Sequence, residues 1–447
     1  METDTIANIS TPLGFGGIGV IRISGPRSLG IVLKLLKRER KITPRRAHHV
    51  FLKDREGKSL GDAIVIYFKG PESYTGEDVV EIQTFGSPVL MNKILSEIIS
   101  LGARLSKPGE FTERAYLSGK LDLIKAEAIN KIVFSESEFE LYSAVNTLEG
   151  EISERVKKWI EELTGIHSQI EGSISFPNDV EEPDRREVEE EVKKILKEIE
   201  ELIEEYEREK GFIEGVNLVI FGKANVGKSS LFNILLKEER VLVSRMPGTT
   251  RDIVSEKIFI DGIPFKLMDT AGVIVKVENE VDRMAIDKSK EALSKADIII
   301  LMFDGSIPLS EEDYKAVSLV KRKRFIPVIN KVDLPLVISK EEIAKLTGKE
   351  PMLISCLTHE GIENLKNKLS NEFKKPNVKK LFYISLREKN ILTEVLRNLK
   401  ASLKETLTID EVSIEIGEAI RKLKLLVGEE FDPDVTKEIF SRFCIGK

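Results

Sequence analysis

The chain has 447 residues, of which 41% are hydrophobic and 32% are charged, and its formal net charge is −6 at pH 7. This length exceeds one ordinary hydrophobic core, so we expect two or three domains, and the composition excludes a disordered or fibrous protein. The acidic balance excludes bulk electrostatic binding of nucleic acid, and a pair of cysteines, Cys356 and Cys444, excludes a disulfide framework.

No segment of the sequence predicts a membrane protein. The N-terminal stretch METDTIANIS carries acids and has no apolar core of a signal peptide. The longest apolar run, residues 298–303, has the length of a strand and is far too short to span a bilayer. We therefore expect a soluble protein of the reducing cytoplasm with no membrane partner.

Residues 1–117 predict a mixed α and β domain. GVIRIS and AIVIYF have strand-like patterns, whereas VLMNKILSEIISLG has helical spacing. GFGGIG, residues 14–19, fits the dinucleotide-binding fingerprint by letter, but Pro12 interrupts the segment before it and a strand-like alternation follows it. We expect these glycines to form a tight turn near a ligand or another subunit.

A basic stretch lies within this first domain. Residues 34–58 contain ten lysines and arginines against three acids. They could contact the phosphates of an RNA, or they could form an exposed element without a partner. The second interpretation is favoured, because charged residues are mostly exposed whatever their function.

Residues 118–210 and 374–447 both predict long helices. The break SFPNDVEEPD separates two helical stretches in the first segment, and the second segment contains three further amphipathic helices. We expect the two segments to pack together as one discontinuous helical domain. The intervening residues 211–373 alternate strand, turn and helix, so the sequence predicts a doubly wound, mainly parallel α/β domain inserted into the helical one.

A phosphate-binding loop opens the inserted domain. An apolar strand leads into Gly222-x-x-x-x-Gly227-Lys228-Ser229 and then into an apolar helix, which is the context that a P-loop requires. Backbone N–H groups and the helix N-terminus bind phosphates there, Lys228 would reach the β- and γ-phosphates, and Ser229 would bind Mg²⁺. The predicted GTP-binding residues of this loop are Asn225, Val226, Gly227, Lys228, Ser229 and Ser230.

Three further motifs follow in order, each at the end of an apolar strand. Asp333 in Asn-Lys-x-Asp would accept hydrogen bonds from the N1–H and amino group of guanine, which adenine cannot offer. This tetrapeptide resembles the guanine-binding motif of Ras-like GTPases. The predicted nucleotide-binding residues of the three motifs are Asp269, Thr270, Ala271 and Gly272, then Asn330, Lys331 and Asp333, then Ser355 and Cys356.

The loop SRMPGTTRD lies between the first two motifs. Thr249 or Thr250 would complete the Mg²⁺ coordination as a switch residue. Ras-like enzymes carry a water-orienting glutamine directly after the DTAG glycine, and Val273 occupies that position here. Another group must therefore position the attacking water.

Over essentially its full length the chain resembles the MnmE (TrmE) family of tRNA-modification GTPases. DTIANISTPLGFGGIGVIRISGP is similar to the opening of that family, and YTGEDVVEIQ and KPGEFTERAYLSGKLDLIKAEA resemble its next two signatures. GKANVGKSSLFN, GTTRD and DTAG resemble its GTPase core, and the Cys-x-Gly-Lys ending is also characteristic.

The resemblance implies that the N-terminal domain binds tetrahydrofolate and forms a homodimer. The folate contacts of the family correspond to Arg22, Glu81 and Lys120. A carboxylate such as Glu81 suits the amide and amino edge of a pterin, and the two cations suit carbonyl, formyl or glutamate oxygens.

The resemblance also implies a G domain that is activated by dimerisation, with K⁺ in place of an arginine finger. The implied K⁺ ligands are Asn225, Ser244, Met246 and Thr249, and the implied Mg²⁺ ligands are Ser229 and Thr250. The family orients water with a downstream glutamate. Asp282 stands where that glutamate is expected, and Glu280 is the alternative.

The implied activity is modification of C5 of the wobble uridine of certain tRNAs. The implied partner is an MnmG-type protein that carries FAD and uses NADH, in a heterotetramer. The one-carbon unit would come from 5-formyl- or methylene-tetrahydrofolate, and GTP hydrolysis would drive a conformational switch. A different class of function, a GTP-dependent assembly factor for RNA or the ribosome, explains the G motifs equally well but leaves both other domains unexplained.

The C-terminal SRFCIGK allows three interpretations of Cys444. A prenylation box would make it a lipid anchor, but Gly446 and the charged Lys447 do not fit such a box. It could be a core residue beside Phe440 and Phe443, since free cysteines are usually buried. The resemblance favours a thiol near the folate and the tRNA uracil, with Lys447 leaving the chain end cationic.

Overall fold

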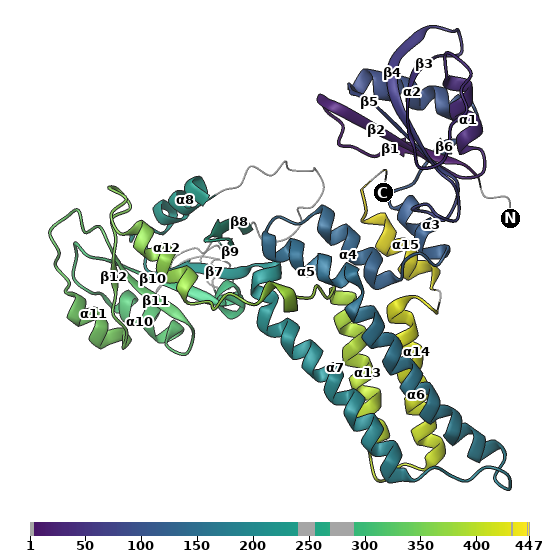
Figure 1. Cartoon of the computed structure of the whole chain (residues 1–447). Helices are drawn as coiled ribbons and strands as arrows, with labels where there is room; N and C mark the ends of the chain where they lie inside the picture. The colour runs from purple at the N-terminus through teal and green to yellow at the C-terminus, as the bar shows by residue number, and fades with distance from the viewer. Residues whose placement is uncertain (1–3, 240–254, 269–289, 431, 445, 447) are drawn as a thin grey trace, which may run out of the picture. The chain divides into compact units, whose positions relative to one another are not determined.

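The computed structural model describes residues 4–239, 255–268, 290–430, 432–444 and 446. The chain divides into two compact units (Figure 1). Unit 1 comprises Met1–Val133, Thr147–Glu200 and Ile384–Lys447, and unit 2 comprises Phe134–Asn146 and Glu201–Tyr383. None of the helices in the described ranges combines the length and the apolarity needed to cross a bilayer.

Unit 1 begins with a six-stranded sheet in the order β3-β4-β5-β2-β1-β6. Its strands are β1 (Ile6–Ile9), β2 (Gly16–Ser24), β3 (Ala47–Lys53), β4 (Ser59–Phe68), β5 (Val79–Gly86) and β6 (Arg104–Leu105). Neighbouring strands are antiparallel except for β1 and β6. Helices α1 (Ser28–Leu35) and α2 (Pro88–Ser100) pack apolar side chains onto the sheet. The glycine-rich stretch enters β2 without a following helix, so it does not form a dinucleotide-binding turn.

The register of this sheet brings three polar residues into one row. Arg22 of β2 lies opposite both Asn8 of β1 and Glu81 of β5. Directly paired residues of an antiparallel sheet point to the same face. The sheet therefore places Arg22 and Glu81, which are 59 positions apart in the sequence, side by side.

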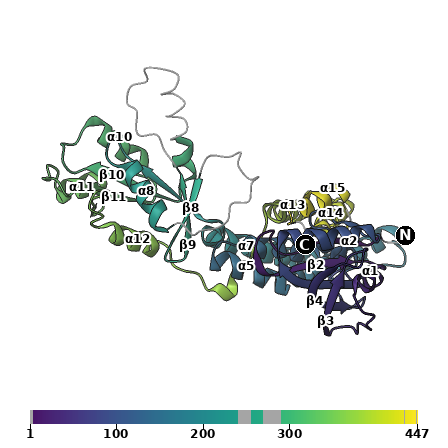
Figure 2. The ribbon, with the colours of Figure 1, turned by 90° about the horizontal axis from the view of Figure 1, so that it is seen from above.

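The rest of unit 1 is helical. Its helices are α3 (Glu110–Leu117), α4 (Leu123–Val133), α6 (Glu151–Ser175), the first part of α7 (Arg185–Glu214), α13 (Leu386–Ser402), α14 (Ile409–Val427) and α15 (Pro433–Ser441). Helix α14 packs against both α13 and α6, and Figure 2 shows α13, α14 and α15 together from a second direction. This packing confirms the predicted discontinuous helical domain, because α6 precedes the inserted α/β segment and α13 and α14 follow it.

Capping residues define where the C-terminal helices begin. Ser385 and Thr408 each form a reciprocal capping box with the glutamate three positions later. Asp432 caps α15, whose first residue is Pro433, and the side chain of Asp432 accepts the backbone N–H groups of Asp434 and Val435. These local signals fix the helix starts, and the buried apolar faces fix their packing.

Unit 2 contains a second six-stranded sheet in the order β12-β11-β10-β7-β9-β8. Its strands are β7 (Val216–Phe221), β8 (Ser255–Ile260), β9 (Ile263–Met268), β10 (Ile298–Asp304), β11 (Phe325–Asn330) and β12 (Met352–Leu353). All neighbours are parallel except the β8–β9 hairpin. The described helices of this part include α8 (Lys228–Glu239), α10 (Glu311–Val320), α11 (Lys340–Thr347), α12 (Ile362–Asn371) and the short η1 (Val378–Lys380).

The central strands β10 and β11 are buried along their whole length, as expected for parallel strands covered by helices on both faces. The carboxyl ends of β7, β11 and β12 meet at one edge of the sheet. Ligands of doubly wound sheets bind at that edge. The predicted Ras-like α/β fold is confirmed, and its topology brings three of the predicted motifs together.

Candidate nucleotide and folate sites

The P-loop has the backbone conformation that a phosphate cradle needs. Gly222 and Gly227 have φ values of 153° and 103°, and Asn225 has a φ of 63°. A Cβ on Gly222 would come within 2.5 Å of the Met302 carbonyl oxygen, and one on Gly227 would collide with the side chain of Asn330. A larger residue at either position would be strained by its positive φ and would also clash with neighbouring atoms, so both glycines are required.

The first turn of α8 follows this loop directly. Its first residue is Lys228, whose Nζ donates to the carbonyl oxygens of Gly222 and Lys223 at 3.1 and 2.7 Å. The two predicted serines come next, and both Ser229 and Ser230 are exposed. A cation, hydroxyl groups and the positive end of a helix dipole thus lie together, which suits a phosphate chain with a bound divalent cation.

Asn330 connects the P-loop to the loop that follows β12. It is 2% exposed, its Nδ2 donates to the Val226 carbonyl at 2.8 Å, and its Oδ1 accepts the backbone N–H of Cys356 at 3.1 Å. One buried amide therefore fixes two segments about 130 residues apart in sequence. The predicted asparagine lies at the centre of the site as a positioning residue.

Asp333 is held in place by the same loop. The Ser355 hydroxyl donates to Asp333 Oδ1 at 2.5 Å, and it accepts the backbone N–H groups of Leu357 and Thr358. The carboxylate of Asp333 itself is exposed. It is oriented by one partner and remains accessible to the paired donors of a guanine edge.

Two ion pairs at this edge were missed by the sequence analysis. Lys331 has a φ of 67°, and its Nζ lies 2.5 Å from Asp304 at the end of β10. Burial alone would raise the pKa of Asp304, but Lys331 and Ser306 hold that pKa below its ordinary value. The aspartate at the end of the β10 run IIILMFD is visible in the sequence, but its partner is not.

The second missed pair anchors the P-loop itself. Lys223 Nζ lies 2.6 Å from Asp313 of α10, and both side chains are buried. Asp313 also completes the capping box of α10 with Ser310. Breaking one partner of a buried pair is costly, so this contact keeps the P-loop fixed against the start of α10.

Cys356 contributes its backbone to the site. Burial raises the pKa of its thiol to about 11, an effect that Asn330 only partly offsets. The thiol is therefore protonated near neutral pH and is a poor nucleophile. The backbone N–H of Cys356 already donates to Asn330, and the predicted contact of Cys356 with the nucleotide stays a prediction.

The remaining predicted residues of the G domain lie outside the described residues. They are Ser244, Met246, Thr249, Thr250, Asp269, Thr270, Ala271, Gly272, Glu280 and Asp282. The K⁺ ligands other than Asn225, the Mg²⁺ ligand Thr250 and the choice between two water-orienting carboxylates consequently stay predictions.

Arg22 and Glu81 form a second site on the N-terminal sheet. The Nε and Nη2 of Arg22 both donate to Glu81 Oε1, at 3.0 and 2.9 Å, and each side chain is 19% exposed. The Arg22 guanidinium also lies 5.2 Å from the ring centre of Tyr74 and 5.7 Å from that of Phe111. Phe111 is fully buried, so the groups that remain accessible to a flat, hydrogen-bonding ring system are the half-buried Tyr74 and the ion pair.

Lys120 lies at the border of the same region. Its side chain is exposed, and its backbone N–H donates to the Ala115 carbonyl at the end of α3. Its Cε lies 3.9 Å from the position that a Cβ on Gly76 would occupy, two residues from Tyr74. Lys120 is thus free to move its ammonium toward an anionic group near this loop.

The C-terminal tail approaches the folate-site strand. The Ser10 hydroxyl donates to the Gly446 carbonyl at 3.0 Å, and Ser10 lies two positions beyond Asn8, the residue paired with Arg22. Ser10 directly follows β1, which ends at Ile9. Cys444, two residues before Gly446, is half-buried, while Phe440 and Phe443 are buried in a cluster with Tyr116. The predicted tail residue Lys447 lies outside the described residues.

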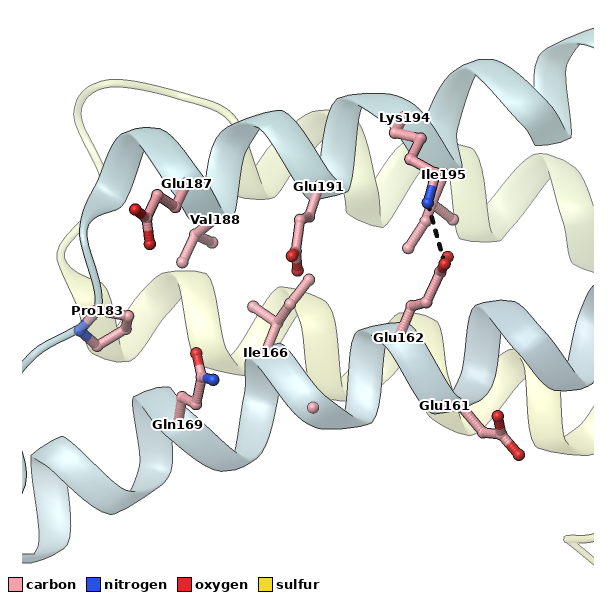
Figure 3. Close-up of a pocket in the computed structure, with 11 residues that line it drawn as sticks. Glu161, Glu162, Ile166, Gln169, Pro183, Glu187, Val188, Glu191, Lys194 and Ile195 are labelled. Carbon is pink, nitrogen blue, oxygen red and sulfur yellow. Dashed lines mark hydrogen bonds and ion pairs between the residues drawn. The ribbon is translucent and has the colours of Figure 1, made fainter.

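A separate cavity of about 370 Å³ lies between α6 and α7 (Figure 3). Glutamates from both helices line it together with the apolar Ile166 of α6 and Val188 of α7, and Lys194 pairs with Glu162 at 3.0 Å. None of the site residues predicted from the sequence lines this cavity. We assign it no part in nucleotide or folate binding.

Two family models match the chain. One described as "GTP-binding protein TrmE N-terminus" matches residues 5–120, and one described as "MnmE helical domain" matches residues 123–444. Together these models cover both of the regions in which the sites lie.

Named relatives match over the full length. The chain is 38% identical to the tRNA modification GTPase MnmE of Thermotoga maritima, with 99% of this chain and 100% of that protein covered. It is 40% identical to the protein of the same name from Caldicellulosiruptor saccharolyticus, with 100% of both covered. The G domain of the T. maritima FeoB iron transporter is 26% identical over 35% of this chain and 97% of that chain, with a TM-score of 0.28, and the assignment does not depend on it. The chain belongs to the MnmE (TrmE) family of tRNA modification GTPases.

Proposed function

We propose that this protein is a GTP hydrolase that acts, with a partner protein, in the modification of wobble uridine in tRNA. The observation that carries the nucleotide part is the bridge made by Asn330, which joins the P-loop to the Ser355–Asp333 pair. Phosphate binding and base selection are thereby built into one connected edge of the sheet. Asp333 selects guanine because adenine would leave its carboxylate without a second donor.

Hydrolysis requires groups that neutralise charge on the transferred phosphoryl group. Mg²⁺, held by Ser229 and Thr250, and K⁺, held by Asn225 with Ser244, Met246 and Thr249, supply positive charge when bound. Support comes from Asn225, whose left-handed backbone turns its exposed side chain away from the interior. Asp282 or Glu280 orients the attacking water, since Val273 replaces the usual glutamine.

The N-terminal domain binds a tetrahydrofolate, 5-formyl- or methylene-substituted. Arg22 holds one oxygen of Glu81, so the carboxylate is oriented before the ligand arrives and can accept donors from a pterin edge. The half-buried Tyr74 supplies apolar surface for the ring, the buried Phe111 supports the Arg22 guanidinium from within, and Lys120 neutralises glutamate or formyl oxygens.

A homodimer is formed through the N-terminal domain. Support comes from strongly exposed apolar side chains around the glycine-rich stretch, which a monomer would leave in water. Phe15 is 94% exposed, and the others of this group are Leu13 at 71%, Ile18 at 67%, Phe85 at 57% and Val89 at 80%.

Cys444 acts at the folate site together with the cationic Lys447. Support comes from the Gly446 carbonyl, which accepts the hydroxyl of Ser10 directly after β1, and two residues of chain span at most about 7 Å. This contact holds the tail beside the strand whose Asn8 pairs with Arg22. The partner is an MnmG-type protein that carries FAD, and the two proteins form a heterotetramer in the cytoplasm. The basic residues 34–58 are a further candidate for contact with tRNA.

A two-part experiment tests this function. Purified protein should hydrolyse GTP faster in K⁺ than in Na⁺ and should bind tetrahydrofolate. A strain lacking the gene should regain modified wobble uridine with the wild-type chain and not with Cys444→Ser. Equal hydrolysis in both salts together with no folate binding would contradict the proposal, and co-sedimentation with ribosomal subunits with normal wobble modification would favour an assembly factor instead.

A further inference from the structure

Residues 134–146, here called the linking segment, belong to unit 2 although they precede its G domain by about 70 residues of sequence. They contain the first nine residues of α5 (Glu138–Glu149), and the last three residues of that helix belong to unit 1. One continuous helix therefore crosses from one unit to the other. An α-helix transmits displacement along its axis, because its backbone hydrogen bonds resist stretching.

An ion triad fastens the linking segment to β8. Lys257 of β8 donates to Glu140 at 2.6 Å and to Glu136 at 2.8 Å. Glu140 is 1% exposed and Lys257 is 24% exposed, so this is a largely buried contact. Glu140 also accepts the backbone N–H of Glu136, so one carboxylate binds both the chain that leads into α5 and the strand.

A row of aromatic rings makes a second, independent connection. Phe139 of α5 lies 5.2 Å from Phe212, Phe212 lies 6.5 Å from Phe373, and Phe373 lies 5.9 Å from Phe265 of β9. The two strands of the β8–β9 hairpin thus both reach α5, one through charges and the other through ring packing.

The C-terminal end of the linking segment contacts residues 378–383, through which the chain leaves the G domain. Asn146 Nδ2 donates to the carbonyls of Val378 and Leu381 at 2.7 and 2.8 Å, and the backbone N–H of Tyr383 donates to the Ser143 carbonyl. The segment therefore contacts both the hairpin and the connection that leads back to unit 1.

The β8–β9 hairpin lies between two nucleotide-binding motifs in the sequence, which connects these contacts to the nucleotide. The GTTRD motif ends three residues before β8 begins, and the DTAG motif starts directly after β9. Two motifs that respond to a γ-phosphate in GTPases flank one hairpin, so a shift of either motif acts on β8 and β9.

We propose that the linking segment is the mechanical connection between the nucleotide site and the helical domain, with Lys257 as its positioning residue. The state of the nucleotide displaces the β8–β9 hairpin, Lys257 and the aromatic row carry this displacement to α5, and α5 delivers it into unit 1. This inference rests on the proposed GTPase function and adds the residues through which hydrolysis acts on the helical domain.

Hydrogen exchange of the full-length protein, with GDP and with a non-hydrolysable GTP analogue, tests the proposal. In the wild type we expect amides of residues 138–149 to exchange at rates that differ by about fivefold or more between the two nucleotides. In Lys257→Ala this difference should disappear, while the nucleotide-dependent protection of residues 222–232 and the rate of GTP hydrolysis stay within twofold.

Two further variants separate coupling from folding. Lys295→Ala removes an exposed lysine of the same unit, which pairs with Glu291, and should behave as the wild type. If Lys257→Ala fails to fold, the double variant Lys257→Met with Glu140→Gln keeps the packing without the buried charges and should show the same loss of coupling.

The outcomes distinguish the two proposals. A wild-type protein that does not hydrolyse GTP would overturn the proposed function. A wild type that hydrolyses GTP but shows no nucleotide-dependent exchange in α5, or a Lys257 variant that retains it in full, would overturn the linking role alone.

Discussion

The nucleotide site and the proposed folate site are built in opposite ways. The nucleotide site is made from short contiguous motifs whose backbone atoms do most of the binding, as in the loop from Gly222 to Lys228. The folate site is made from single side chains on different strands and helices, which only the sheet register brings together. The first type can be recognised along the sequence, whereas the second needs the fold.

The largest expected effect is a change in which base the nucleotide site selects, caused by a substitution away from the P-loop. Asp333→Asn replaces an acceptor with a donor, so guanine loses two charge-assisted hydrogen bonds while xanthine, with a carbonyl in place of the amino group, gains one. We expect GTP affinity to fall by about 100-fold or more, and xanthosine triphosphate to bind better than GTP. Calorimetric titration with both nucleotides measures this.

A matched control keeps that test specific. Glu341→Gln neutralises an exposed acid of α11 in the same unit and should leave both affinities unchanged. If Asp333→Asn bound GTP as tightly as the wild type, Asp333 would not be the base-selecting residue.

The next effect concerns the proposed folate site around Arg22 and Glu81. Glu81→Ala removes the carboxylate that Arg22 orients, and it leaves a partly buried guanidinium without its ion-pair partner. We expect tetrahydrofolate affinity to fall at least about tenfold, with GTP binding unchanged. Glu72→Ala breaks an exposed ion pair with Arg45 in the same domain and should leave folate affinity intact. Equal folate affinity in the Glu81 variant and the wild type would refute the assignment.

A third effect concerns the tail. Phe440 is 2% exposed and its ring packs against Tyr116 and Phe443, so Phe440→Ala leaves a cavity in the cluster that directly precedes Cys444 in the sequence. We expect a local loss of about 3 kcal/mol, seen as faster hydrogen exchange in residues 110–126 and 433–444. Phe176→Ala, at a phenylalanine that is 60% exposed, is the control and should cost far less. Unchanged exchange in Phe440→Ala would show that the tail does not depend on this cluster.

The sequence predicted the fold class and the order of the nucleotide motifs because each motif carries its own local signal. It could not predict that Lys331 pairs with Asp304, since that contact depends on how β10 and β11 align. The same holds for Arg22 and Glu81, which the resemblance indicated as separate ligand contacts and which the register of β2 and β5 joins.

The apolar spacing of a helix also does not show to which compact unit the helix belongs. The apolar spacing of residues 138–149 predicts one helix, but it does not say that the first nine residues belong with the G-domain sheet. A contact consistent with that assignment comes from Lys257, more than a hundred positions later, whose charge compensates the buried Glu140. Contacts of this separation follow from tertiary packing alone.

The smallest expected effect is a change of stability with pH. It concerns two buried carboxylates, Asp304 and Glu388, whose pKa values shift in opposite directions. Asp304 is stabilised as an anion by Lys331, whereas burial and the neighbouring Glu127 raise the pKa of Glu388 well above its ordinary value, despite Arg387. The folded state thus binds the proton of Glu388 more tightly than the unfolded state does. Stability contributed by this group is present below its ordinary pKa and is lost as pH rises through the raised pKa.

Glu388→Gln removes the titration while keeping an oxygen that can accept the Ser385 backbone N–H, as Glu388 Oε2 does at 2.7 Å. We expect the melting temperature of the variant to approach or exceed that of the wild type as pH rises from 5 to 8, a gain of a few degrees at most. Glu411→Gln provides the control, because Glu411 occupies the same capping position on α14 but is exposed. A stability difference between Glu388→Gln and the wild type that stayed constant across this pH range would mean that Glu388 is already ionised in the folded protein, and that Arg387 compensates both Glu127 and Glu388.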